Sequence, residues 1–352
     1  MLSARLRSLR AYETETSEAR VRLSSNELPY DLPRELKRRI GEEAGRIPLH
    51  RYPDPTCGEL KAVLADFFGV GEENLLLGNG SDELVYYLSV AVGELDQGVY
   101  IPVPTFPMYE ISADVFGRPK VAVPLGEDFD IDLQKSLRRL REEGAALAYF
   151  SYPNNPTGNL FSEEKIRALR EEGLLTVVDE AYYHYSRKSF LEEALRREDT
   201  VVLRTLSKIG LAGLRVGVLI AREELVRELE KIRLPFNVSY PSQVIARLVL
   251  TEGRDFIEEA VERVVSERER LRRELSSIEG VEVFPSSANF LLFRTPFPAG
   301  ELHAALLRRG VLVRNVSHLP RLERCLRVSV GREEENDLFL EALNSAIREL
   351  GG

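Results

Sequence analysis

The chain has 352 residues, of which 43% are hydrophobic; this is enough to bury a large core and predicts a folded protein of two domains. Its formal net charge is −9, and lysine and arginine alternate with glutamate along the expected helices, which excludes an extended basic surface for nucleic acid. The two cysteines, Cys57 and Cys325, exclude a disulfide framework and lack the paired spacing of a zinc site, so we expect a reducing, cytoplasmic setting.

Residues 1–30 are polar and irregular after a short helical start, and we interpret them as an N-terminal arm. Residues 1–7 contain no apolar core of signal-peptide length, and no later apolar run is long enough to span a bilayer. We therefore expect a soluble protein without a membrane segment.

Residues 31–234 alternate short apolar strands with amphipathic helices. The expected strands are 74–77, 99–103, 120–123, 146–151, 174–178, 201–204 and 216–220, and the expected helices between them are 82–92, 133–142, 163–172 and 223–232. Strands that are apolar on both faces predict an α/β domain with a mostly parallel central sheet flanked by helices. In such sheets, ligand chemistry gathers at the carboxyl ends of the strands.

Residues 235–352 follow a different pattern, which predicts a smaller α+β domain. The expected helices are 240–252, 255–278, 299–308 and 333–350, and the expected strands are 281–284, 290–294, 311–314 and 325–330. The four histidines of the chain show no metal-ligand spacing, so we expect no metal site.

Residues 77–84, Leu-Gly-Asn-Gly-Ser-Asp-Glu-Leu, join an expected strand to an expected helix. The glycines allow a turn that points the amides of Ser81 and Asp82 outward, and a helix N-terminus suits a phosphate. On the local sequence alone, an ordinary N-cap at Ser81 or Asp82 is the more common explanation of these residues. Arg215 and the hydroxyl of Ser207 would favour the phosphate interpretation if they reach the same place.

Lys208 and Asp179 follow neighbouring expected strands and form the most informative pair in the chain. A lysine amine can form a Schiff base with pyridoxal phosphate, and the pyridinium nitrogen of that cofactor needs an acidic partner. An aspartate at a strand end is more often a cap, but its combination with Lys208 favours the pyridinium partner. Earlier in the chain, at the end of the strand that precedes the Asp179 strand, residues 151–158 predict a proline-bounded turn whose asparagines can also supply an amide donor.

These motifs together resemble the signature set of the fold-type I pyridoxal-phosphate aminotransferases, and within them the histidinol-phosphate aminotransferase subfamily. The resemblance covers nearly the whole chain from about residue 23 and rests on 22–27, 51–54, 78–83, 153–158, 179–182, 207–208, Arg215 and 325–331, in the family's order. It implies the fold-type I architecture, with a large cofactor-binding domain and a smaller C-terminal domain.

The resemblance also implies a role for each matched residue. Lys208 would hold the cofactor and move the proton at the substrate Cα, Asp179 would keep the pyridine nitrogen protonated, and Tyr182 with Asn155 would hydrogen-bond the phenolic oxygen of the ring. Phe106 would stack on the ring face. The cofactor phosphate would be held by Ser81, Asp82, Ser207 and Arg215. Tyr52 would reach the cofactor of a partner subunit, which implies a homodimer with a shared active site.

Substrate choice depends on two arginines in this resemblance. Arg327 matches the residue that grips a carboxylate, and Arg314 matches a second arginine that binds a substrate phosphate; without the resemblance, Arg314 is equally well a surface arginine. Leu28 departs from the family pattern, because relatives often carry a polar residue there, and this puts a polar substrate contact in doubt. The expected substrates are small molecules, a phosphorylated amino alcohol and glutamate.

The function that the resemblance implies is a ping-pong exchange between histidinol phosphate with 2-oxoglutarate and imidazole-acetol phosphate with glutamate, a step of histidine biosynthesis. Two alternatives stay open. One is an aromatic or broad-range aminotransferase of the same subgroup, and the other is a threonine-phosphate decarboxylase, a lyase on the same scaffold.

Overall fold

A seven-stranded sheet forms the centre of the large domain in this computed structural model, which describes residues 2, 4–9 and 15–351. The strand order is β2-β8-β7-β6-β5-β3-β4. Neighbouring strands from β7 to β4 run parallel, and β8 runs antiparallel to both of its neighbours. The predicted α/β class with a mostly parallel sheet is therefore confirmed.

All strands predicted in the large domain are present, with small shifts at their ends. They are β2 (Leu75–Asn79), β3 (Gly98–Val103), β4 (Lys120–Pro124), β5 (Ala145–Ser151), β6 (Leu175–Asp179), β7 (Thr200–Thr205) and β8 (Val216–Ile220). The helices up to the end of this sheet are α1 (Ala4–Ser8), α2 (Arg34–Ala44), α3 (Gly58–Phe68), α4 (Ser81–Ala91), α5 (Met108–Phe116), α6 (Leu133–Glu143), α7 (Glu163–Arg170), α8 (Tyr183–Ser186), α9 (Leu191–Arg196) and α10 (Glu223–Leu229), with short 3-10 turns at Glu72–Asn74, Leu206–Lys208 and Ala212–Leu214.

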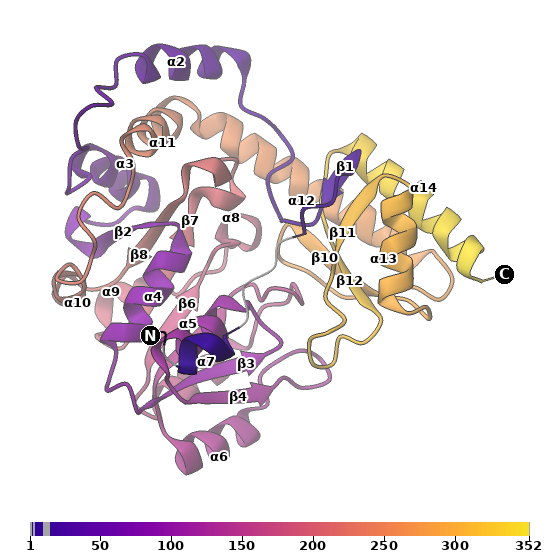
Figure 1. Cartoon of the computed structure of the whole chain (residues 1–352), viewed down its shortest axis with the longest axis horizontal. Coiled ribbons are helices and arrows are strands. Elements are labelled where there is room, and N and C mark those ends of the chain that lie inside the picture. Colours follow the sequence, from indigo (N-terminus) through magenta and orange to yellow (C-terminus); the bar gives the residue numbers. More distant parts are fainter. Residues whose placement is uncertain (1, 3, 10–14, 352) are drawn as a thin grey trace.

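Side chains alternate between two apolar cores on opposite faces of the sheet. On β5, Leu147 and Tyr149 enter one core, whereas Ala148 and Phe150 enter the other. Helices α4, α5 and α10 cover the first core, and α3, α7 and α11 (Tyr240–Glu252) cover the second. Helices therefore cover both faces, as a parallel sheet requires (Figure 1).

A second, five-stranded sheet has the order β1-β11-β12-β10-β9 and carries the remaining helices. Its elements are β1 (Val21–Leu23), α12 (Arg254–Ser276), β9 (Glu282–Val283), β10 (Phe290–Arg294), α13 (Ala299–Arg308), β11 (Val311–Asn315), β12 (Cys325–Ser329) and α14 (Glu333–Leu350). Strand β1 pairs in parallel with β11, so the N-terminal segment joins the sheet of the C-terminal part (Figure 1).

The division into 1–30, 31–234 and 235–352 stays a prediction, and two contacts bear on how its parts are joined. Helix α11 packs against α2 and α3 of the large domain, whereas α12 packs against β9, β10 and α14 and also against α8 of the large domain. In the arm, Arg5 Nη1 donates to the carbonyl oxygen of Phe116 at 3.0 Å, which ties α1 to the end of α5. Residues 10–14 of the predicted arm lie outside the described part of the chain. Among the described residues, no helix is both long and apolar enough to cross a membrane.

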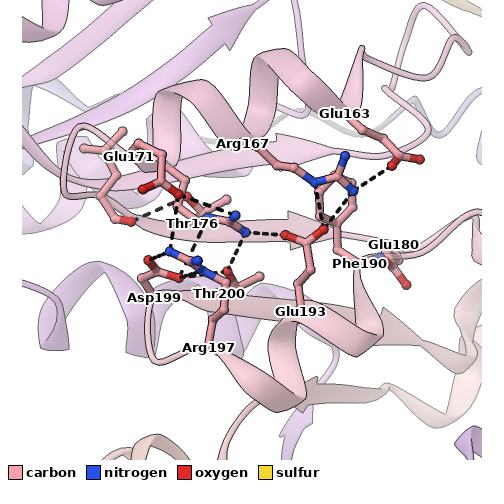
Figure 2. Close-up of polar contacts among 12 residues, drawn as sticks. Glu163, Arg167, Glu171, Thr176, Glu180, Phe190, Glu193, Arg197, Asp199 and Thr200 are labelled. Atoms are coloured by element: carbon pink, nitrogen blue, oxygen red, sulfur yellow. Dashed lines mark hydrogen bonds and ion pairs between the residues drawn. The ribbon is translucent and has the colours of Figure 1, made fainter.

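An ion-pair network links α7 and α9 to the beginning of β7, and Figure 2 shows its members. Glu193 accepts hydrogen bonds from Arg167 Nε at 2.9 Å and from Arg170 Nη1. The side chain of Arg170 is only 5% exposed, and its guanidinium also donates to Thr200 Oγ1 at 3.2 Å. Burial opposes ionisation of Glu193, but the hydrogen bonds from the two arginines outweigh it and lower the pKa of this carboxyl. The network therefore fixes α7 and α9 by a partly buried charge cluster.

We expect Glu193→Gln to lower the free energy of unfolding by about 2 kcal/mol, because the buried Arg170 loses its nearest carboxylate and keeps only the longer ion pairs with Glu171 at 3.7 Å and Asp199 at 3.9 Å. Since the folded-state pKa of Glu193 is lowered, its contribution is present above the ordinary value of 4.5 and is lost as the pH falls through the folded pKa. Urea unfolding at pH 7 and at lower pH measures both effects. The matched control is Glu192→Gln, because Glu192 is 84% exposed and, within the described part of the chain, pairs only with the exposed Arg196 at 3.6 Å. An equal loss in the two variants at pH 7 would contradict the role of the network.

Candidate active site

The carboxyl ends of β5, β6 and β7 meet at one edge of the large sheet, where they border a cavity of about 480 Å³. Ser151 at the end of β5 is the direct neighbour of Asp179 at the end of β6. The turn after β7 brings Lys208 to the same edge, and the small domain supplies Arg314 and Arg327. The cavity thus lies where the sequence predicted the chemistry, between the two sheets.

Asp179 is a buried carboxylate, 3% exposed, with two hydrogen-bond donors. The Tyr109 hydroxyl donates to its Oδ2 at 2.7 Å, and the backbone N–H of Ala181 donates to its Oδ1 at 3.1 Å. Burial raises the pKa of Asp179 to about 6, and these two hydrogen bonds act in the opposite direction. At neutral pH the group is therefore mostly ionised and can hold a cationic N–H.

Lys208 ends a 3-10 turn, Leu206–Lys208, that begins where the Thr205 side chain accepts a hydrogen bond from the backbone N–H of Ser207 at 3.1 Å. Its amine donates to the carbonyl oxygen of Ser25 at 3.3 Å and lines the cavity. Burial and, second, the charge of Arg327 lower the pKa of Lys208 to about 8. At pH 7 the amine is still mostly protonated, but its neutral, nucleophilic fraction is far larger than that of an ordinary lysine.

An anion cradle forms at the N-terminus of α4, where the first-turn amides of Ser81 and Asp82 have no partner within the helix. Arg215 reaches it from the strand opposite: Nη2 donates to Asp82 Oδ2 at 3.1 Å, and Nη1 lies 3.5 Å from Ser207 Oγ. Gly80 has a φ of 79°, and a Cβ there would lie 2.4 Å from Arg215 Nη2. The four predicted phosphate residues therefore come together, with an arginine pressed against the glycine turn.

Tyr182 and Asn155 both line the cavity, and each is held by a contact to another segment. Asn26 Nδ2 donates to the Tyr182 hydroxyl at 3.0 Å, and Arg327 Nη1 donates to Asn155 Oδ1. Phe106 lines the same cavity from the turn before α5. These positions agree with a planar ring bounded by Phe106, Asp179 and Tyr182.

Arg314 and Arg327 are direct cross-strand neighbours on β11 and β12, and both line the cavity. Like charges at such a position repel each other unless anionic groups lie between or beside them. Arg327 Nη2 donates to the carbonyl oxygen of Ser24, and the carboxylate of Glu15 lines the same end of the cavity. A hydrogen bond from the Ser17 hydroxyl and, more weakly, the charges of His303 and Arg314 lower the pKa of Glu15. This end of the cavity is therefore suited to an anionic ligand group.

Two predicted positions lie elsewhere. Tyr52 is 78% exposed and does not line the cavity of its own chain; its ring stacks on Phe236, with centroids 4.5 Å apart. Leu28 is buried and packs near Gly210 in the core, whereas its neighbours Asn26 and Glu27 line the cavity. The side chain of Leu28 thus points away from the space in which a substrate contact was expected.

Sequence reasoning missed Tyr109 and Asn26. Tyr109 is fully buried, and in the motif 104–109 a role was predicted for Phe106 alone. A buried carboxylate at Asp179 requires a hydrogen-bond donor, and none of the predicted site residues supplies the one that Tyr109 provides. Asn26 is buried with a φ of 56°, which asparagine tolerates better than most residues, and it links Tyr182 to Ser329 Oγ. Its place in the 22–27 motif was the only available signal.

The residues present fit pyridoxal phosphate. The donor set comprises an amine, a buried carboxylate, an aromatic face and a helix N-terminus with an arginine, all bordering one cavity. Among the described residues, no group of three or more histidine, cysteine or acidic side chains is placed to hold a metal ion. The arrangement can therefore hold an aromatic ring with a phosphate tail next to a nucleophilic amine.

The comparisons with known proteins agree with this geometry. The family model described as aminotransferase class I and II matches residues 19–343. A histidinol-phosphate aminotransferase of Aquifex aeolicus is 64% identical over 350 residues, and one of a Hydrogenobaculum species is 43% identical over 350 residues; each alignment covers 99% of both chains. The crystal structure of the histidinol-phosphate aminotransferase of Sinorhizobium meliloti in complex with pyridoxal-5'-phosphate superposes with a TM-score of 0.87 at 26% identity, covering 99% of this chain and 98% of that one.

We expect Gly80→Ala to weaken the binding of pyridoxal phosphate about tenfold or more, because the new Cβ would displace the Arg215 guanidinium and its charged hydrogen bond. Titration of the apoprotein followed by absorbance measures the affinity. The matched control is Gly69→Ala: Gly69 has a similar φ of 70°, but a Cβ there meets nothing within 4 Å. Both variants should lose stability from the left-handed backbone, but only Gly80→Ala should lose affinity. Unchanged affinity in Gly80→Ala would contradict the cradle.

Proposed function

This chain belongs to the class I and II aminotransferase family, and on that premise we propose that it transfers an amino group between histidinol phosphate and 2-oxoglutarate with pyridoxal phosphate as cofactor. The observation that carries the proposal is the pair Arg314 and Arg327, which share one cavity with Lys208 and Asp179. The names of relatives 64% and 43% identical over almost the whole chain support the same substrate and a place in histidine biosynthesis.

Bound pyridoxal phosphate supplies a carbonyl carbon that accepts amines and a protonated ring that takes up the electrons released at the substrate Cα. Side chains of the protein bind the cofactor and move the proton. Lys208 holds the cofactor and then moves the proton at the substrate Cα, for which its amine must be neutral; burial and Arg327 lower its pKa to about 8. Asp179 holds the proton of the ring nitrogen, while Tyr182 and Asn155 orient the phenolic oxygen.

The two arginines explain how one cavity takes two substrates that differ in their anionic groups. Arg327, anchored by Asn155 and the carbonyl of Ser24, presents a fixed planar donor that suits the carboxylate of glutamate. Arg314 lies beside it on the neighbouring strand and adds the second charge that a phosphate dianion needs. Glutamate and histidinol phosphate can therefore use the same strands in successive halves of a ping-pong reaction.

A homodimer with a shared active site is part of the proposal. Exposed apolar side chains gather next to Tyr52: Leu49 is 77% exposed, Leu234 is 60% exposed and Phe236 stacks on Tyr52 itself. A monomer seldom leaves such a group in water, so a second copy of the chain is its expected cover. In that arrangement Tyr52 would reach the cofactor phosphate of the partner.

The decisive test measures transamination of histidinol phosphate and of unphosphorylated histidinol with 2-oxoglutarate. We expect strong preference for the phosphorylated substrate, and we expect Lys208→Ala to abolish turnover. Arg314→Gln should lower kcat/KM for histidinol phosphate roughly 10- to 100-fold, because it removes a charged contact worth about 1.5–3 kcal/mol, with little effect on the glutamate half-reaction.

The matched control is Arg324→Gln, because Arg324 is an exposed arginine just before β12 that does not line the cavity. Equal activity on phenylpyruvate and on the phosphorylated ketone would favour the broad-range alternative. Release of carbon dioxide without consumption of a keto acid would instead identify a decarboxylase. Full turnover by Lys208→Ala would contradict the whole scheme.

Leu234→Asp tests the dimer, because an aspartate buried without a partner at an apolar interface is strongly unfavourable. We expect the variant to sediment as a monomer at micromolar concentration, where the unmodified chain sediments as a dimer, and to bind pyridoxal phosphate more weakly. Leu95→Asp is the control: Leu95 is 46% exposed but lies before the amino end of β3, away from the cavity edge. A Leu234→Asp protein that remains dimeric would refute this interface.

A further inference from the structure

Tyr109 is a side-chain donor that reaches Asp179 from helix α5. It lies in the first turn of α5, and its hydroxyl donates to Asp179 Oδ2 at 2.7 Å. The Tyr109 side chain is fully buried and Asp179 is 3% exposed, so water does not compete for this contact. A hydrogen bond between a neutral phenol and a buried carboxylate favours the ionised form of the acid.

Two aromatic rings contact the ring of Tyr109 and fix the direction of its hydroxyl. It lies flat against Tyr149, with ring centroids 4.7 Å apart and an interplanar angle of 2°. Phe106 contacts it edge-on, with centroids 5.6 Å apart and an angle of 83°. Since Phe106 lines the cavity and Tyr149 belongs to β5, the hydroxyl is fixed relative to both the sheet and the cavity.

The carboxylate of Asp179 keeps acceptor positions open after these contacts. An ionised carboxylate has about four lone-pair positions. The Tyr109 hydroxyl occupies one at Oδ2 and the backbone N–H of Ala181 occupies one at Oδ1. The two donors therefore fix the plane of the group and leave it able to accept a further N–H from a ligand in the cavity that it lines.

We propose that Tyr109 is a positioning residue for the reaction: its hydroxyl orients the Asp179 carboxylate, keeps it ionised, and thereby keeps the ring nitrogen of bound pyridoxal phosphate protonated. The inference rests on the proposed function, because it requires that cofactor. Tyr109 itself touches neither substrate nor cofactor in this role, and it acts through Asp179.

The charges around Asp179 make such a donor necessary. Burial is the largest influence and raises the pKa of Asp179 to about 6, and the carboxylates of Asp82 on α4 and Glu180 after β6 act in the same direction. The Tyr109 hydrogen bond is the largest opposing influence. The other titratable groups around this point are Tyr149 on β5, Tyr182 before α8, Lys208 and Arg215. Without the phenol, the pKa of Asp179 would rise towards neutrality and the acid would be partly protonated at pH 7.

Tyr149 provides a matched control for Tyr109. It is also fully buried and is the other ring of the same stack, but its hydroxyl donates to the carbonyl oxygen of Val85 at 3.0 Å and lies 2.9 Å from Ser89 Oγ. Tyr149→Phe therefore removes a buried hydroxyl from the same cluster without touching Asp179. Any loss that stems merely from packing or from an unpaired buried group should appear in both variants.

The experiment compares unmodified holoenzyme, Tyr109→Phe and Tyr149→Phe by the ¹⁵N chemical shift of labelled pyridoxal phosphate and by the dissociation constant of the cofactor. In both proteins the ring-nitrogen signal should move towards that of the unprotonated form as the pH rises. We expect this change to occur at a lower pH in Tyr109→Phe than in the unmodified protein. We also expect cofactor affinity to fall about tenfold, the loss of one hydrogen bond to a charged group. Tyr149→Phe should leave both readouts unchanged. The chemical shift is read on folded, cofactor-loaded protein alone, so a lower yield does not obscure it.

A double-mutant cycle separates this role from a general structural one. In protein that already carries Asp179→Asn, the effect of Tyr109→Phe on affinity should fall to about twofold or less, because the charge that the phenol stabilises is gone. Equal effects of Tyr109→Phe and Tyr149→Phe on the nitrogen signal, or an undiminished effect of Tyr109→Phe beside Asp179→Asn, would overturn the inference. Failure of the unmodified protein to bind pyridoxal phosphate would overturn the proposed function instead, and the two failures are thus distinguishable.

Discussion

A carboxylate buried at the end of a parallel strand is the constraint on which the site depends. Asp179 is ionisable, almost completely buried, and placed where β6 stops. Such a group is unfavourable unless donors surround it, so the positions of Tyr109 and Ala181 follow from its presence. Because these donors come from α5 and from the turn before α8, the buried charge couples the packing of two separate segments to one point of the sheet edge.

Hydrogen bonds of Asn26 connect the two sheets. Asn26, next to β1, donates to the Tyr182 hydroxyl of the large domain and exchanges hydrogen bonds with Ser329 of β12. Its backbone carbonyl accepts from Asn289 Nδ2 at 2.9 Å. Strand β1 therefore does more than complete the small sheet, because Asn26 beside it forms a polar link to Tyr182, which lines the cavity. This link explains why the N-terminal segment belongs to the site rather than only to the surface.

The sequence predicted the part of the structure that local patterns determine. Strands apolar on both faces, such as 146–151 and 216–220, were readily found, and the residues after them identified the cavity edge. The sequence did not predict helix α5, because the segment that leads into it and forms its first residues, 104–109, is rich in proline and aromatic residues and resembles a loop. The contact of Tyr109 with Asp179 was therefore not predicted either. The pairing of β1 with β11 joins segments almost three hundred residues apart in the chain, and no local pattern specifies such a contact.

The cavity of this acidic chain concentrates positive charge where a ligand must bind. Arg314 and Arg327 are cross-strand neighbours, and their mutual repulsion is reduced by the amide oxygen of Asn155, the carbonyl of Ser24 and the nearby carboxylate of Glu15. An incoming phosphate or carboxylate therefore replaces existing contacts of the two guanidinium groups. The net gain on binding is the difference between the two sets of contacts, so affinity for small anions alone should be modest. Selectivity then comes from substrates that satisfy the arginines and present an amine to Lys208 at the same time, since only these use both ends of the cavity.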